Sequence, residues 1–211
     1  MINPFEGLSK SQINKLYELL GVHTYRYKNN EEILPTIKSG NIVGIILNGY
    51  AQIIYNEYNG NEIVVENLVM NSVFGTNISA SSDDNCQIIA KDDTEVLVID
   101  YDKLVHPKNL RYIYFNVFFR NLFSIINTKF KETNDRIRVL EKKQIRDKLL
   151  EYFDIEYKKS HSKNVYLPFS LKELADYIAV NRSAMFRELK HLKEDKLIDV
   201  KDRKIVLLYK W

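Results

Sequence analysis

Residues 169–208 read FSLKELADYIAVNRSAMFRELKHLKEDKLIDVKDRKIVLL, and this stretch decides the fold of the C-terminal part of the chain. Ser170 and Glu173 have the spacing of a capping box, in which each side chain bonds the backbone amide of the other residue. Asn181 is a good N-cap for a second helix, predicted over Arg182–Leu192. Between the helices lies a turn at 177–180, where Ala179 stands in a position that many such turns give to glycine. Apolar residues recur at helical spacing in both helices: Leu171, Leu174, Ala175 and Ile178, then Met185, Leu189 and Leu192.

Two short strands follow the second helix. They are predicted at Leu197–Val200 and Ile205–Tyr209, and the basic turn Lys201-Asp202-Arg203-Lys204 joins them. Together with the two helices they predict a helix-turn-helix with a wing.

One face of the second helix is left outside the core by this periodicity. Its residues are one, four and five positions apart and make a compact patch. An arginine fork there can bond guanine O6 and N7, and other donors can bond phosphates. Basic side chains in the wing suit phosphate contact. We therefore predict a DNA-binding set of Arg182, Ser183, Phe186, Arg187, Lys190, Ser170, Asn181, Lys201, Arg203 and Lys204. The alternatives are a solvated helix face, or a winged helix that contacts only proteins.

The charge of the chain is divided unevenly. Residues 1–140 hold 14 Lys and Arg against 16 Asp and Glu, whereas residues 141–211 hold 17 against 12. A basic C-terminal third agrees with a polyanionic partner. The chain has no apolar run of membrane-spanning length and no secretory signal at its start, so we expect a cytoplasmic protein with no membrane partner.

The chain as a whole predicts an α+β protein in three parts. Residues 1–107 form a jelly-roll-like β-roll, predicted to be a sensor domain, because a helix over Lys10–Leu20 precedes short apolar runs separated by turn residues. Residues 139–211 form the winged helix-turn-helix domain. The predicted strands are Ile42–Leu47, Ala51–Tyr55, Ile63–Leu68, Gln87–Ala90 and Val96–Ile99, with turns at Asn48-Gly49, Asn59-Gly60 and Asp83-Asp84-Asn85.

Residues 108–138 predict one long helix that connects these domains. A second apolar set, Phe118 and Ile125, flanks its main apolar seam, so the helix has more apolar surface than one partner needs. We expect one face to pack on the β domain and the seam to pack on a second copy of the chain; burial within one monomer is the alternative. The seam consists of Phe115, Phe119, Leu122, Ile126, Phe130, Thr133, Ile137 and Leu140.

The chain resembles the Crp–Fnr family of bacterial transcription regulators over nearly its whole length. The quoted stretch resembles the helix-turn-helix and wing of that family, including the Arg182 and Arg187 pair. The segment ILNGYAQIIYNEYNGNEIVVENLVMNSVFG resembles the β-roll of cyclic-nucleotide-binding domains. The resemblance implies a homodimer on a two-fold symmetric DNA site, RNA polymerase as a partner, and a signal that acts at the β-roll.

Two residues depart from the family pattern in the recognition helix. Ser183 stands where many members have a base-reading glutamate, and Phe186 stands where many have a small residue. Serine cannot accept a hydrogen bond from cytosine as a carboxylate does. We therefore predict an altered, AT-rich operator.

The residues that bind cyclic AMP in family members are missing. Thr76 replaces the ribose-binding glutamate, and Asp83, Asp84 or Asn85 replaces the phosphate-binding arginine. We predict that cyclic AMP does not control the protein, and an unidentified small molecule or peptide remains possible as the effector. Cys86 could be a redox thiol, although a lone cysteine in a strand is more often buried and inert.

The sequence shows no sign of an enzyme. It contains no HExxH, GxSxG, Walker or GxGxxG motif, and its four histidines have no ligand spacing. A single cysteine cannot hold an iron–sulfur cluster. We predict no catalytic residues, no cofactor and no metal site. A sensor protein whose winged helix serves protein contacts is the alternative function.

Overall fold

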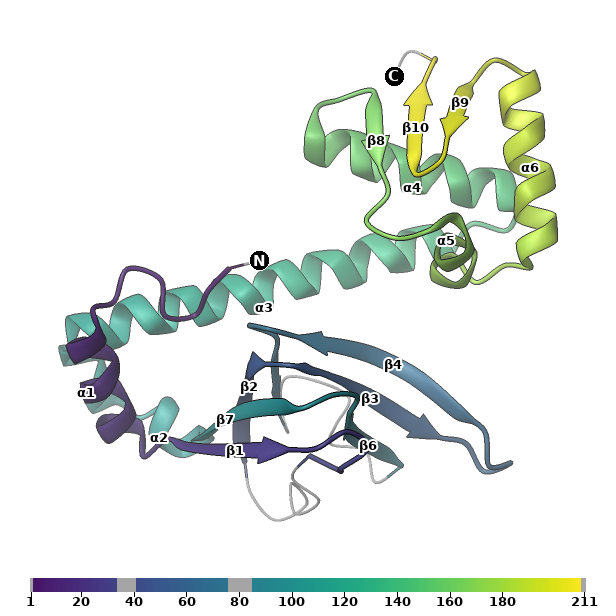
Figure 1. Cartoon of the computed structure of the whole chain (residues 1–211). Coiled ribbons are helices and arrows are strands. Elements are labelled where there is room, and N and C mark those ends of the chain that lie inside the picture. The colour runs from purple at the N-terminus through teal and green to yellow at the C-terminus, as the bar shows by residue number, and fades with distance from the viewer. Residues whose placement is uncertain (1, 34–40, 76–84, 210–211) are drawn as a thin grey trace. The chain divides into compact units, whose positions relative to one another are not determined.

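The computed structural model describes residues 2–33, 41–75 and 85–209, which form two compact units (Figure 1). The first unit spans Met1–Thr128 and the second spans Lys129–Trp211. The boundary lies inside the long helix α3, Ile113–Leu140, so this helix contributes residues to both units. The three-part division at residues 107 and 138 remains a proposal.

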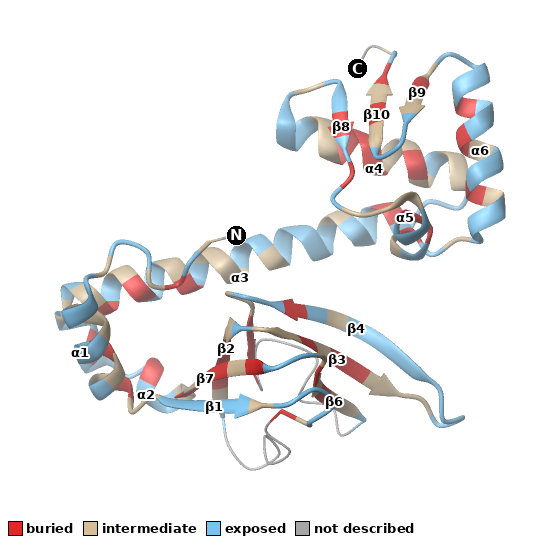
Figure 2. Cartoon of the chain, viewed as in Figure 1, coloured by how far each residue is buried: buried red, intermediate tan, exposed pale blue. Residues whose placement is uncertain are grey.

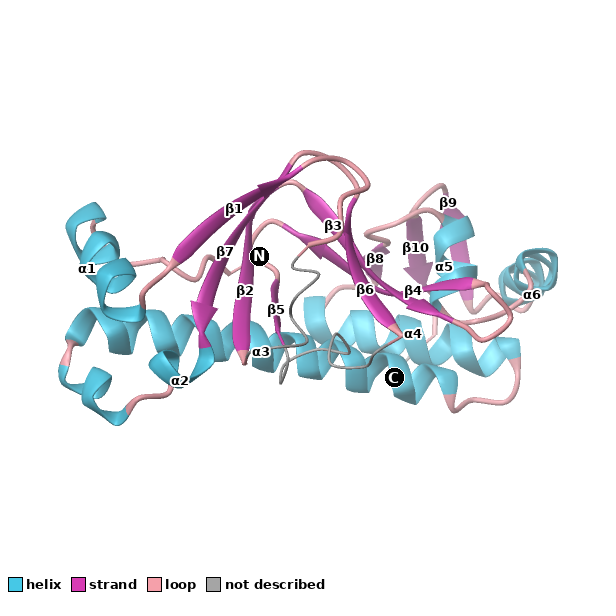
Figure 3. Ribbon diagram, turned by 90° about the horizontal axis from the view of Figure 1, so that it is seen from below, coloured by secondary structure: helices cyan, strands magenta, loops and turns pink. Residues whose placement is uncertain are grey.

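Two antiparallel sheets build the first unit (Figure 3). One has the strand order β1-β7-β2-β5, and the other has the order β4-β3-β6. One buried cluster takes Ile46 and Val96 from the first sheet and Ile53 and Ile88 from the second, so the sheets face each other as layers of a roll. The strands are β1 (His23–Tyr27), β2 (Ile42–Asn48), β3 (Tyr50–Asn56), β4 (Glu62–Val69), β5 (Val73–Gly75), β6 (Cys86–Ala90) and β7 (Thr94–Asp100).

Helices cover the other face of the four-stranded sheet. Val43 and Ile45 of β2 are buried with Leu16 and Phe118 in a second apolar cluster. Strand β2 is thus buried on both faces (Figure 2), which explains why its sequence is a continuous apolar run rather than an alternating one. The helices of this unit are α1 (Lys10–Leu20), α2 (Tyr101–Leu104), the 3₁₀ helix η3 (Pro107–Arg111) and the first part of α3.

The strands and turns expected from the sequence are largely confirmed. All five predicted strands are present, and α1 has the predicted bounds. At the Asn59-Gly60 turn, the Glu57 amide donates to the Asn61 carbonyl oxygen over 2.8 Å, and Gly60 has a φ of +84°. Two further short strands, β1 and β5, were not expected. Of the turn cluster 83–85, Asp83 and Asp84 lie outside the described residues.

The second unit is the predicted winged helix-turn-helix. Its three-stranded sheet has the order β8-β10-β9, in which β9 and β10 are the wing strands and β8 is an addition to the prediction. One buried cluster unites the helices and the sheet, with Phe153, Leu174, Met185 and Ile205 among its members. The elements are α4 (Ile145–Ser160), β8 (Asn164–Tyr166), α5 (Leu171–Tyr177), α6 (Arg182–Glu194), β9 (Ile198–Lys201) and β10 (Lys204–Leu207).

Candidate nucleic-acid interface

Helix α5 begins at the capping box that the sequence predicts. The Ser170 amide donates to Glu173 Oε2 over 2.7 Å, and the Glu173 amide donates to Ser170 Oγ over 3.3 Å. The bond from the Ser170 amide is the main reason that the pKa of Glu173 lies below its ordinary value. Ser170, placed in the DNA-binding set, is half-buried, and its hydroxyl accepts this bond from the first turn of α5.

The turn between α5 and α6 is a Schellman motif. The Val180 amide donates to the Ala175 carbonyl oxygen over 3.0 Å, and the Ala179 amide donates to the Asp176 carbonyl oxygen over 3.2 Å. Ala179 occupies the left-handed position of the motif, with a φ of +52°. These bonds set the position at which α6 begins.

Helix α6 is capped at its start and anchored along its inner side. Asn181 Oδ1 accepts from the Ala184 amide over 3.2 Å, so this member of the predicted DNA-binding set also caps the helix. From α4, Arg146 reaches Glu188 over 3.3 Å and Asp195 over 2.6 Å, which ties α6 to α4 at two points. The inner side chains Met185, Leu189 and Leu192 are buried, as predicted.

The opposite face of α6 is open to solvent. Arg187 has no carboxylate within ion-pair distance among the described residues, because its neighbour Glu188 binds Arg146 instead. Lys190 lies 3.7 Å from Glu194, and Phe186 exposes 43% of its surface. The structure therefore brings the predicted groove-facing side chains together on one surface: Arg182, Ser183, Phe186, Arg187 and Lys190 are all exposed.

Arg182 has a partner that the sequence analysis missed. Its Nη2 donates to Asp176 Oδ2 over 2.8 Å, and its Nε donates to Asp176 Oδ1 over 3.4 Å. The hydrogen bond and the charge of Asp176 raise the pKa of Arg182. The two residues lie on either side of the turn, six positions apart, so no periodicity within one helix places them together.

The wing presents basic side chains at a tight turn. Asp202 has a φ of +53°, which allows β9 and β10 to pair directly on either side of it. Lys201 and Arg203 are exposed, whereas Lys204 is half-buried and its Nζ lies 5.5 Å from the centre of the Tyr166 ring. Lys201 and Arg203 are therefore the wing residues most open to an anionic partner.

Comparison with known proteins matches this unit to one family. Residues 143–210 match the family described as the Crp-like helix-turn-helix domain. The second unit is a Crp-like helix-turn-helix domain. A comparison with curated protein sequences gave no significant match.

Solved structures extend the likeness beyond the Crp-like domain. CprK in complex with OCPA is 16% identical with a TM-score of 0.66, covering 92% of this chain and 89% of that chain. A CooA variant from Carboxydothermus hydrogenoformans is 18% identical with a TM-score of 0.59, covering 97% and 88%. A cyclic nucleotide-binding domain protein from Listeria monocytogenes EGD-e is 18% identical with a TM-score of 0.56, covering 92% and 97%. CprK and CooA are Crp–Fnr regulators, and this chain has the Crp–Fnr-type fold.

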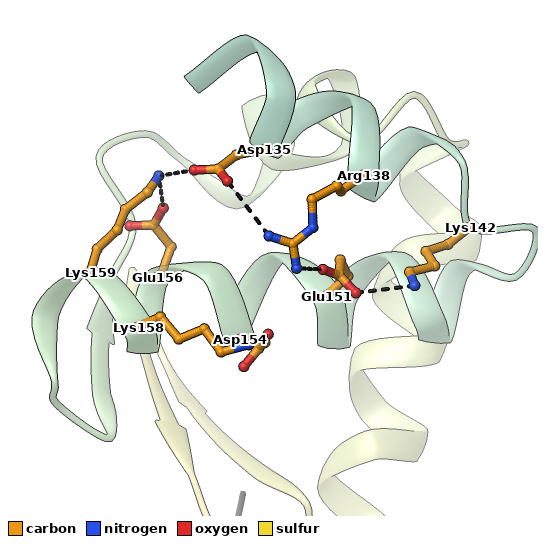
Figure 4. A network of polar contacts seen from close by, with 8 residues as sticks. All are labelled: Asp135, Arg138, Lys142, Glu151, Asp154, Glu156, Lys158 and Lys159. Carbon is orange, nitrogen blue, oxygen red and sulfur yellow. Dashed lines mark hydrogen bonds and ion pairs between the residues drawn. The ribbon is translucent and has the colours of Figure 1, made fainter. Parts of the chain in front are cut away.

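The end of α3 is fastened to the Crp-like domain by charged side chains (Figure 4). Arg138 and Lys142 both bind Glu151 of α4, and the Lys142 contact measures 3.1 Å. Asp135 binds Lys159 at the other end of α4 over 3.2 Å. Because Val139 is also buried in the core of this unit, the last three turns of α3 belong to it structurally.

The predicted dimer seam on α3 is divided between core and surface. Phe115 and Leu122 are each only 2% exposed and lie in the core of the first unit, so these two do not lie on an open seam. Apolar positions on several sides of this helix allowed either assignment from sequence. Ile126 is half-buried, and Thr133 is exposed. The large apolar side chains that remain exposed along α3 are Ile113, Phe119, Phe123, Phe130, Ile137 and Leu140.

The residues used to argue against cyclic AMP lie mostly beyond what the structure describes. Thr76, Asp83 and Asp84 are outside the described residues, and Cys86 is half-buried in β6. In the parts of the chain that the structure describes, no three His, Cys, Asp or Glu side chains are grouped as metal ligands would be. No helix in those parts is both long enough and apolar enough to span a bilayer.

Proposed function

We propose that this chain is a sequence-specific DNA-binding transcription regulator. The observation that carries the proposal is the exposed face of α6, where Arg187 is unpaired among the described residues, with Lys201 and Arg203 exposed in the wing. A capped, anchored helix with such a face can enter the major groove while the wing binds phosphates. The Crp-like helix-turn-helix match to residues 143–210 supports the same conclusion.

The regulator acts as a homodimer on a two-fold symmetric operator. A two-fold dimer places two recognition helices about 34–36 Å apart, one turn of DNA. Exposed Phe119, Phe123 and Phe130 give α3 an apolar surface that a second copy can cover. RNA polymerase, and a small-molecule effector other than cyclic AMP, complete the proposed partners.

The operator differs from the usual family site. Ser183 and Phe186 are both exposed on the groove-facing side of α6, so both can reach base edges. Serine lacks the carboxylate that accepts from cytosine, and the phenylalanine edge suits a thymine methyl group. An AT-rich half-site follows from this pair.

The test combines operator selection with one substitution. Wild-type protein is used to select duplexes from a random library, and binding is then measured by gel shift at several salt concentrations. Arg187→Ala should lower operator affinity by at least about 1–3 kcal/mol and remove specific binding, with the dimer intact. Lys10→Ala, which removes one positive charge from α1 in the first unit, is the control and should bind as the wild type does.

Two results would contradict the proposal. Operator affinity that Arg187→Ala leaves unchanged would refute the recognition surface. Recovery of the common family consensus from the library would refute the altered operator. The protein-contact alternative predicts a third pattern, in which the wild type selects no sequence at all.

A further inference from the structure

We propose that Asp176 is a positioning residue for base reading, which holds the guanidinium of Arg182 so that its free edge can bind one guanine in each half-site. This inference rests on the proposed function and deepens it, because it names a base and the residue that prepares its recognition. Asp176 itself is not expected to touch DNA.

The geometry of the pair defines which edge of the arginine is engaged. Asp176 accepts from Nε and Nη2, so it occupies one side of the guanidinium fork with both of its carboxylate oxygens. The side chains of Arg182 and Asp176 are 57% and 59% exposed, so the pair lies on the surface of the unit and not in its core.

The engaged edge leaves a complementary one available. A guanidinium carries five N–H donors in a fixed plane, and a side-on carboxylate uses two of them. The end of the fork keeps one donor on each terminal nitrogen, and these two are parallel. Guanine offers O6 and N7 as a matching pair of acceptors in the major groove. Arg182 can therefore bind Asp176 and a guanine at the same time, which a lysine at this position could not do.

Position in the fold makes the pair a fixed element. Arg182 is the first residue of α6, and Asp176 lies in the last turn of α5. The hydrogen bonds of the turn between them, at Ala179 and Val180, fix the distance between the two helix ends. Holding a long side chain in one orientation before binding reduces the ordering that binding would otherwise require.

The carboxylate also acts against binding at random sites. A negative charge beside Arg182 repels phosphates and reduces the net charge that this end of α6 offers to any DNA. Only a correctly placed guanine uses the prepared edge of the arginine. Both effects raise the ratio of specific to non-specific affinity, while an exposed ion pair contributes little to folding stability.

A different role for the same pair makes the opposite prediction. If Asp176 only neutralises Arg182, then DNA must break the ion pair. Removal of the carboxylate would then raise affinity for every DNA by the same factor and leave the ratio unchanged. The two roles are therefore separable by measuring the ratio.

The experiment compares full-length wild type with Asp176→Asn by fluorescence anisotropy. The probes are a duplex selected by the wild type from a random library, the same duplex with 7-deazaguanine at the half-site guanines, and a scrambled duplex. We expect Asp176→Asn to lower the preference for guanine over 7-deazaguanine by about 10-fold, on the scale of one bidentate contact. Affinity for the scrambled duplex should be equal or higher, with a salt slope that is steeper by up to about one.

A control and a second variant complete the test. Glu194→Gln removes one carboxylate from the far end of α6, where it faces Lys190, and should leave the preference unchanged. Arg182→Lys should lose the preference, and Asp176→Asn added to it should cause no further loss, because the two residues act as one unit. Thermal melting by circular dichroism verifies that each variant is folded.

The outcomes distinguish this inference from the function on which it rests. A preference for guanine that survives Asp176→Asn, or a selected operator with no guanine in its half-sites, would overturn the positioning role and leave the DNA-binding function standing. A wild-type protein that selects no sequence would overturn the proposed function, and the positioning role with it.

Discussion

Replacement of Ala179 by glycine should stabilise the Crp-like domain. Ala179 has a φ of +52° in the Schellman turn, where its Cβ crowds the backbone and costs about 1–2 kcal/mol. The residue is exposed, so the lost methyl group removes no core packing. Glycine also adds about 0.4–1 kcal/mol of conformational freedom to the unfolded chain. The difference predicts a gain of about 0.5–1 kcal/mol in the free energy of unfolding.

Urea denaturation of the full chain, followed by circular dichroism, measures this gain as a higher midpoint at an unchanged slope. Ala184→Gly is the matched control, because Ala184 lies in the first turn of α6 with helical geometry. That variant should lose up to about 1 kcal/mol, since glycine in a helix is less favourable than alanine. If both variants lost stability equally, the argument from left-handed strain would be refuted.

Two further predictions concern the first turn of α5 and the exposed side of α3. Because the capping bond lowers the pKa of Glu173, its contribution to stability is present above its ordinary value of 4.5 and is lost as the pH falls through the lowered value; the stability difference between wild type and Glu173→Gln should therefore shrink on acidification, and urea midpoints between about pH 7 and pH 3 that keep a constant difference would contradict this. Phe130, which is 65% exposed, should support the dimer, so Phe130→Glu should shift sedimentation toward the monomer while Asn127→Glu, exposed on another side of α3, should not; equal sedimentation of the two variants would exclude this seam.

Local signals in the sequence predicted most of the elements of the fold. The helix over Lys10–Leu20 was predicted with its bounds, and the capping boxes that begin α1 and α5 are both formed. The strands that were missed carry little local signal. His23–Tyr27 is mostly polar and exposed, and it forms a strand only because β7 pairs with it along an edge of the sheet. Strands β5 and β8 have three residues each, too few for an alternation to be recognised.

Surface and core were harder to separate on α3 than on α6. On α6 the apolar positions form one narrow stripe, so the exposed patch from Arg182 to Lys190 followed directly from it. On α3, Phe115, Phe118 and Phe119 point in different directions, and periodicity alone could not decide which of them the sheet would cover. The pair of Asp176 and Arg182 depends on the angle between two helices, a property that neither helix encodes alone.

The charged contacts between α3 and α4 have a practical consequence for grafting this DNA-binding module onto other sensors. The family match begins at residue 143, but a fragment cut there would lose Val139 from its core and leave Glu151 without Arg138 and Lys142. A hybrid joined near residue 129, inside α3, keeps all of these contacts. The transplantable piece is therefore longer than the piece that sequence comparison outlines, and its natural joint is the middle of a helix rather than a loop.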